Sequence, residues 1–217
     1  MMKISKVITV IIFLVFSALR LHGQSPILGI NAGGNISYQS VSGIQSANTK
    51  SKVGYIFGTF VDFNVGKVLK ITPEINFTLK GSKVQHNTDN NSIIEVPTKL
   101  YYVTIPINAK VGFSASKNLF AYMLAGPRID VHVDDNDNGL IGLFKNRNAI
   151  NFGFSLGAGL SYYGHEGRLF GLEIRYCPDI TKYSVDKYTY EGVVTSYPVG
   201  TEFRNESLEL VLKVAFR

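Results

Sequence analysis

The feature of this sequence that most constrains its fold is a strict alternation of side-chain type along NFGFSLGAGLSYY, Asn151 to Tyr163. Every second residue from Phe152 to Tyr162 is apolar or aromatic, and the residues between them are Gly or Ser. A period of two is typical of a β-strand, because successive side chains of a strand point to opposite faces. The stretch therefore predicts a strand with one face of large apolar residues and one face of small residues.

The same alternation recurs along the chain, and no segment after the first residues has the spacing of an amphipathic helix. Each segment has about the length of a membrane-spanning strand, roughly ten residues. The segments are 27–38, 53–65, 69–81, 101–113, 119–133, 151–163, 169–177 and 207–217. The sequence therefore predicts an all-β fold with about eight strands.

The connections between these segments alternate in length. The short ones lie at 66–67, 114–118 and 164–168. The long ones, which are rich in Asn, Asp, Ser, Lys and Gly, lie at 39–51, 85–95, 134–148 and 180–203. An antiparallel up-and-down sheet with such connections has all short turns and both termini at one end. We therefore predict an eight-stranded transmembrane β-barrel with short periplasmic turns and long extracellular loops.

Side-chain size predicts which face of the strands meets lipid. The alternation alone leaves open a soluble, lipocalin-like barrel whose apolar face lines a ligand-binding interior. However, the interior of eight strands is only wide enough for side chains to fill it, which suits the face of Gly and Ser. We expect the following residues to face lipid: Phe152, Phe154, Leu156, Leu160, Tyr162, Leu208, Leu210, Leu212 and Phe216.

The polar faces of the predicted strands carry cations and carboxylates in nearly equal number. A Lys or Arg on the lipid face costs about 2–4 kcal/mol at the middle of the bilayer, so we expect these groups inside the barrel. Besides the soluble barrel, a small-solute pore is an alternative. Paired charges would fill the lumen, and a filled lumen argues against a pore. The predicted lumen charge network is Asp62, Lys70, Glu74, Lys80, Lys110, Arg128, Asp130, Glu173, Arg175, Glu209 and Lys213.

Residues 1–23 have the layout of a cleavable signal peptide. Two lysines precede an apolar run, 7–19, that is short for a membrane-spanning helix, and the small residue Gly23 stands before Gln24. We therefore expect an exported chain with one domain, 24–217, in the outer membrane of a Gram-negative bacterium.

Removal of the signal peptide changes how the net charge is interpreted. The whole chain has 22 basic and 16 acidic residues, and its net charge of +6 includes the basic residues of the leader. The remaining excess forms no dense Lys/Arg cluster, so nothing predicts binding to nucleic acid. Cys177 is the only cysteine, which excludes an intrachain disulfide.

Five short motifs are spread along the chain: PEINFTLKGSK at 73–83, Ile105-Pro106, Ala125-Gly126-Pro127, FGFSLGAG at 152–159 and GLEIRY at 171–176. Together they resemble the motifs of the PorT-like outer-membrane β-barrel family of Bacteroidetes-type bacteria. The resemblance covers essentially the whole mature chain and implies an outer-membrane barrel. The namesake of the family is implicated in protein secretion, a role that the motifs carry to no named residue. Phe216, beside the last residue, is the expected signal for the outer-membrane assembly machinery.

One stretch resembles a calcium-binding loop. In DDNDNG, at 134–139, Asp134, Asn136 and Asn138 occupy the first ligand positions of such a loop. Lys145 stands where the loop needs a bidentate Glu, so we expect solvated turns and no metal or cofactor.

A hydrolytic site is the other chemistry that we considered. Asp130 and His132 share a strand face and could activate a serine such as Ser155. No spacing rule links these residues, so we expect a protein that is not an enzyme. Tyrosines of the strands are expected to anchor the barrel at the membrane interface: Tyr101, Tyr102, Tyr122, Tyr162, Tyr163 and Tyr176.

These observations favour a structural or interaction module. The expected partners are outer-membrane lipids, the assembly machinery, and an unknown protein or surface ligand that contacts the long outer loops, above all 181–204. A link to secretion or surface binding would fit this role. The small-solute pore and the soluble ligand-binding barrel are the alternatives.

Overall fold

The computed structural model describes residues 26–42, 48–87, 93–97, 99–135, 150–164, 168–184, 187–190, 193–196 and 201–216. Its long strands are β1 (Ile27–Ser42), β2 (Asn48–Asn64), β3 (Leu69–Lys80), β6 (Leu100–Ser114), β7 (Leu119–Asp135), β8 (Ile150–Tyr163), β9 (Leu169–Pro178) and β13 (Glu202–Phe216). Among the described residues, no helix is long and apolar enough to cross a membrane. The predicted signal peptide, 1–23, lies outside the described residues.

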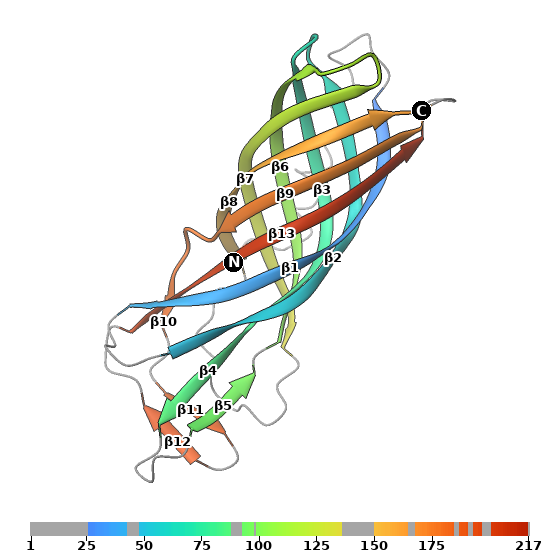
Figure 1. Cartoon of the computed structure of the whole chain (residues 1–217). Coiled ribbons are helices and arrows are strands. Elements are labelled where there is room, and N and C mark those ends of the chain that lie inside the picture. Colours follow the sequence, from blue (N-terminus) through green and yellow to red (C-terminus); the bar gives the residue numbers. More distant parts are fainter. Residues whose placement is uncertain are drawn as a thin grey trace.

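These eight strands form a closed antiparallel barrel (Figure 1), which confirms the predicted fold class. Each strand pairs with its neighbours in chain order. The barrel closes because β1 pairs with the last strand, from Leu28 opposite Phe216 to Ser42 opposite Glu202, and also with β2. Closure leaves these strands without an unpaired edge, as a membrane requires of a sheet.

The short connections all lie at one end of the barrel. The turns 65–68 and 115–118 join β2 to β3 and β6 to β7. Gly66 has φ +95°, a left-handed conformation that favours glycine, which explains its place in the first of these turns. β1 begins and β13 ends at the same end, since Leu28 lies opposite Phe216. Both ends of the barrel sheet therefore lie on the short-turn side, as the connection lengths predict.

The opposite end carries additional short strands (Figure 1). They are β4 (Ser82–Asn87), β5 (Ile93–Pro97), β10 (Tyr183–Ser184), β11 (Lys187–Tyr190) and β12 (Val193–Ser196). β4 pairs with the first residues of β2 and also with β5, while β11 and β12 form a separate hairpin. Parts of the segments 85–95 and 180–203, which the sequence analysis treats as loops, are thus strands, because backbone pairing extends beyond the alternating segments.

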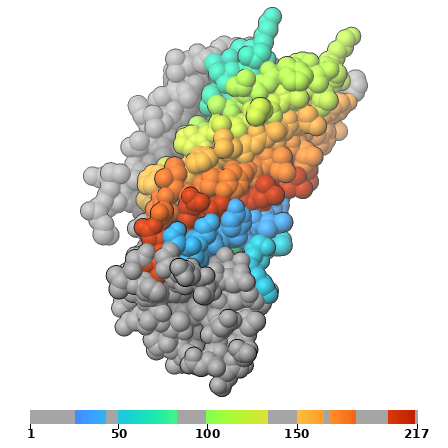
Figure 2. All heavy atoms as spheres, turned by 60° about the vertical axis from the view of Figure 1, so that its left-hand side comes forward, coloured from blue at the N-terminus to red at the C-terminus, as the bar shows by residue number. Residues whose placement is uncertain are grey.

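The barrel has an apolar outer wall and a polar interior. On β1, Leu28 and Ile30 are 63% and 61% exposed, whereas Asn31 and Asn35 are 4% and 2% exposed. Figure 2 shows one side of this wall, where β7, β8, β9, β13 and β1 follow one another. A soluble barrel has the opposite arrangement, so the structure favours a barrel surrounded by lipid.

Three of the tyrosines expected at the membrane interface lie inside the barrel instead. Tyr102 and Tyr122 are buried, and Tyr163 packs against the buried residues near the short turns. The expectation is wrong for these three because each has an outward-facing neighbour in the strand, which places the tyrosine itself on the inner face.

Candidate functional site: the charged lumen

All the charged residues predicted for the lumen lie buried inside the barrel. Each is at most 9% exposed: Asp62, Lys70, Glu74, Lys80, Lys110, Arg128, Asp130, Glu173, Arg175, Glu209 and Lys213. Asp179, which the sequence analysis does not include, is also buried and pairs with Arg128. With Asp179, these lumen residues contain as many carboxylates as cations. Equal numbers allow every charge a partner, which burial of ions requires.

Glu74 on β3 is the centre of the network nearer the short turns. Its two carboxylate oxygens accept hydrogen bonds from Arg175 Nη1 and Nη2 at 3.0 and 2.7 Å, the bidentate geometry that suits a guanidinium. Lys213 Nζ donates to Glu74 Oε1 at 2.6 Å, and Asn31 and Asn76 donate to Oε2. Glu74 therefore connects strands β1, β3, β9 and β13 across the lumen.

Glu173 on β9 extends this network to β6 and β7. Its carboxylate pairs with Arg175, with Lys110 at 3.0 Å and with Lys213 at 3.2 Å. Tyr122 Oη donates a hydrogen bond to Glu173 Oε1 at 2.7 Å. The Lys110 ammonium also lies 3.2 Å from Asp62. Each cation here is thus shared between carboxylates, so the loss of one residue would leave several partners unpaired.

A glycine lets Tyr122 reach this network. Tyr122 lies opposite Gly159 of β8, and Glu173 follows on β9 in the same register. A Cβ at position 159 would lie 2.7 Å from Tyr122 Oη and 2.8 Å from Glu173 Cγ. The small residues of the alternating stretch therefore make room for the side chains that cross the lumen.

A second cluster lies nearer the outer end of the lumen. Lys80 Nζ donates to Asp130 Oδ2 at 2.6 Å, and Arg128 Nη2 lies 3.2 Å from the same oxygen. Arg128 also pairs with Asp179 and lies 3.9 Å from Glu209. Asp179 follows β9 and forms an isolated bridge with Gly153 of β8. It lies beyond Pro178, where the alternation stops, and no sequence signal predicts that it faces the lumen.

The end of the lumen near the short turns is apolar. Ile27, Phe60, Leu169 and Ala215 form a buried cluster there, with Tyr163 packed against it. Lys70 lies among aromatic rings, 4.6 Å from the Phe120 centroid and 4.8 Å from the Tyr163 centroid, and donates to the Tyr163 hydroxyl. Cation–π contact thus stabilises this cation where carboxylates are farther away.

The candidates for catalysis and metal binding are placed differently. Asp130 is engaged by Lys80 and Arg128, while the His132 ring lies edge-on to Tyr102 at 5.3 Å. Ser155 Oγ lies 3.7 Å from Cys177 Sγ. Asn136, Asn138 and the side chain of Asp134 lie outside the described residues. Within the part of the chain that the structure describes, no three His, Cys, Asp or Glu side chains group as metal ligands do.

The residues predicted to face lipid mostly lie on the outer wall. The exposed ones are Phe152, Leu156, Leu160, Tyr162, Leu208, Leu210 and Leu212. Phe154 is half-buried on the same face, and the side chain of Phe216, the predicted assembly signal, lies outside the described residues.

A hydrogen-bonded carboxylate lies on the outer wall near the long-loop end. Glu206 accepts hydrogen bonds from Tyr38 Oη at 2.6 Å, Ser40 Oγ at 2.7 Å and Arg204 Nη2 at 2.6 Å, and also from Tyr176. Polar groups on an outward face are tolerable only at the edge of the apolar band, so we place the outer boundary of the membrane near this cluster.

The closed barrel, its apolar wall and its ion-paired lumen define a transmembrane β-barrel of the bacterial outer membrane. The chain belongs to the outer membrane protein beta-barrel domain family, whose match spans residues 24–184. No curated protein matches the sequence.

Two solved structures of outer-membrane proteins are similar to this chain at low sequence identity. OprG from Pseudomonas aeruginosa is 11% identical, with a TM-score of 0.54 over 88% of this chain and 94% of OprG. Neisserial surface protein A is 15% identical, with a TM-score of 0.47 over 89% of this chain and 100% of that protein. The likeness to OprG concerns the fold alone.

Proposed function

We propose that this protein is a closed, rigid barrel that holds a binding platform at the outer surface of the membrane. The observation that carries the proposal is the filled lumen, in which buried cations and carboxylates pair over an apolar floor. A lumen of this kind contributes rigidity, whereas the strands β4, β5, β10, β11 and β12 extend the protein at the long-loop end. The part that can contact a partner is therefore the outer end.

Single-channel recording in planar lipid bilayers tests the proposal against the small-solute pore. The platform predicts no stepwise conductance from the purified, refolded barrel. The variant Glu74→Gln is recorded in parallel, because it disrupts ion pairs in the lumen without changing the number of strands. Regular conductance steps of the unchanged protein would overturn the closed-barrel proposal and favour the pore.

A loop exchange tests the platform itself. The segment 181–204 is replaced by a short Gly/Ser turn, while the barrel strands stay intact except for the first residues of β13. We expect the variant to keep the faster gel mobility of an unboiled barrel and to lose the proteins that crosslink to the unchanged protein on cells. A crosslinking pattern that does not change would contradict a role for this segment.

We further propose that the chain is a PorT-like member of the family and acts without catalysis. The motifs at 73–83, 152–159 and 171–176 support the first part. The engagement of Asp130 by Lys80 supports the second, since that carboxylate binds a cation rather than orienting a base. Lipase or protease activity that His132→Ala abolishes would contradict the absence of catalysis.

A further inference from the structure

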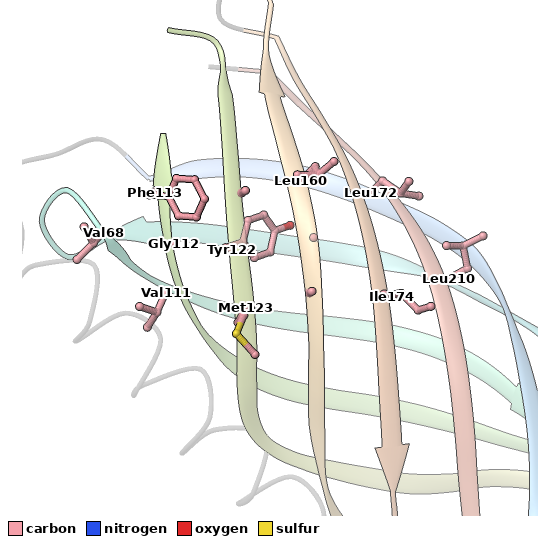
Figure 3. A pocket seen from close by; sticks show the side chains of 13 residues that line it. Val68, Val111, Gly112, Phe113, Tyr122, Met123, Leu160, Leu172, Ile174 and Leu210 are labelled. Carbon is pink, nitrogen blue, oxygen red and sulfur yellow. The ribbon is translucent and has the colours of Figure 1, made fainter. Parts of the chain in front are cut away.

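The outer wall of the barrel has an apolar groove of about 930 Å³ near the short turns (Figure 3). It begins at Phe113 of β6, close to the 115–118 turn, crosses β7, β8 and β9, and reaches Leu210 of β13. This volume is in the range of small-molecule sites, about 300–1,000 Å³. The groove is therefore large enough to hold part of a lipid molecule.

Alternation of large and small outward residues creates this groove. Across the strands, Ala121 lies between Phe113 and Leu160, and in the next row Ala158 lies between Met123 and Ile174. Phe113 and Met123 project strongly, with 66% and 73% of their surface exposed. The alanines form the floor and the larger side chains form the walls, as Figure 3 shows for the labelled walls.

Each of the two neighbouring turns at this end of the groove contains a lysine. Val68 of the 65–68 turn lines the groove, and its carbonyl accepts a hydrogen bond from Gly112 N of β6 at 2.9 Å. Lys67 precedes Val68, and Lys117 lies in the 115–118 turn; both lysines are exposed. These two turns contain no acidic residue. The turns at this end of the groove thus carry a net positive charge.

We propose that the groove binds one anionic phospholipid of the inner leaflet. Short turns of outer-membrane barrels face the periplasm, which places Lys67 and Lys117 at the level of the inner-leaflet headgroups. An acyl chain would lie over Ala121 and Ala158, and the phosphate would lie near the two lysines. A second copy of the chain in the groove would bring its own Lys67 and Lys117 close to these two lysines, and like charges repel each other. Charge complementarity therefore favours an anionic lipid as the occupant.

Native mass spectrometry of the folded barrel tests this site. The protein is released from detergent micelles that contain equal amounts of phosphatidylglycerol and phosphatidylethanolamine. We expect one retained lipid with a preference for phosphatidylglycerol. In Lys67→Gln/Lys117→Gln, we expect the preference to fall roughly fivefold for each lysine removed. In Ala121→Leu/Ala158→Leu, we expect both lipids to be lost, because leucine fills the floor.

Two matched variants control for general effects. Ala32→Leu adds the same bulk to an exposed alanine on β1, outside the groove, and Lys99→Gln removes an exposed lysine that precedes β6 at the other end. Both are expected to bind lipid as the unchanged protein does, and gel mobility before boiling verifies that every variant folds.

Lipid retention by Ala121→Leu/Ala158→Leu at the normal level would overturn the proposal, as would a phosphatidylglycerol preference that survives loss of both lysines. A dimer that this alanine variant dissociates would also overturn it, by assigning the groove to a second copy.

Discussion

Replacement of Glu74 tests the energetic role of the paired lumen most directly. The Glu74 carboxylate accepts hydrogen bonds from Arg175 at 2.7 and 3.0 Å and from Lys213 at 2.6 Å, and its side chain is 0% exposed. Glu74→Gln keeps the shape of the side chain but removes the charge. Removal of one member of a buried ion pair costs about 3–5 kcal/mol, so we expect a decrease of this size in the free energy of unfolding.

A compensating substitution separates the charge imbalance from the loss of packing. Lys213→Met removes one of the cations that Glu74→Gln leaves in excess and keeps much of the apolar stem. Lys213 also lies 3.2 Å from Glu173, so its removal alone is destabilising. We therefore expect the double variant to be less destabilised than the sum of the two single variants, by about 0.5–3 kcal/mol, the range of coupling within one network.

The assay is equilibrium unfolding in urea after insertion into lipid vesicles. Far-UV circular dichroism and gel mobility of unboiled samples serve as probes, because the chain has no Trp. Glu202→Gln is the control: Glu202 pairs with Lys182 at 2.6 Å, but the two side chains are 44% and 51% exposed, so we expect a change below about 1 kcal/mol. A Glu74→Gln effect as small as that of the control would refute the reasoning, since lumen water would then screen the charges. Destabilisation of the double variant by the full sum of the two single effects would refute it as well.

Three further outcomes follow from the same structure. Gly159→Val should lower the temperature at which the unboiled gel band disappears, by overpacking worth about 1–3 kcal/mol against Tyr122 and Glu173; an unchanged temperature would mean that these side chains move aside freely. Leu210→Arg, on the outer wall, should destabilise the barrel in vesicles by about 2–4 kcal/mol in urea titrations, and a neutral result would argue that this wall does not meet lipid. Phe216→Ala should reduce the amount of barrel in outer-membrane fractions on immunoblots while the refolded protein keeps its unfolding midpoint; normal amounts would remove Phe216 as an assembly signal.

The lumen illustrates where residue patterns stop being informative. The alternation places Glu74 and Arg175 on polar strand faces, but it does not indicate that they meet, because they are 101 residues apart in the chain. Their contact depends on the stagger between strands once the barrel closes. Asp179 faces the lumen only because the chain beyond Pro178 continues to pair with β8 through a single bridge. Tyr102 and Tyr122 likewise show that an aromatic residue in a strand can serve the interior as well as the membrane interface.

The sequence by itself determined the strand number, the up-and-down order and the outward apolar face. These properties are local. A period of two assigns each side chain to one face of a strand, and side-chain size indicates which face lines the crowded interior. Connection length indicates which end of the barrel carries the short turns and which carries the long loops. The tertiary structure alone decided which charges pair, how Gly159 admits Tyr122, and where the alanines of β7 and β8 form a groove that extends toward the turns of Lys67 and Lys117. Those properties depend on the register between strands, which closure of the whole sheet fixes.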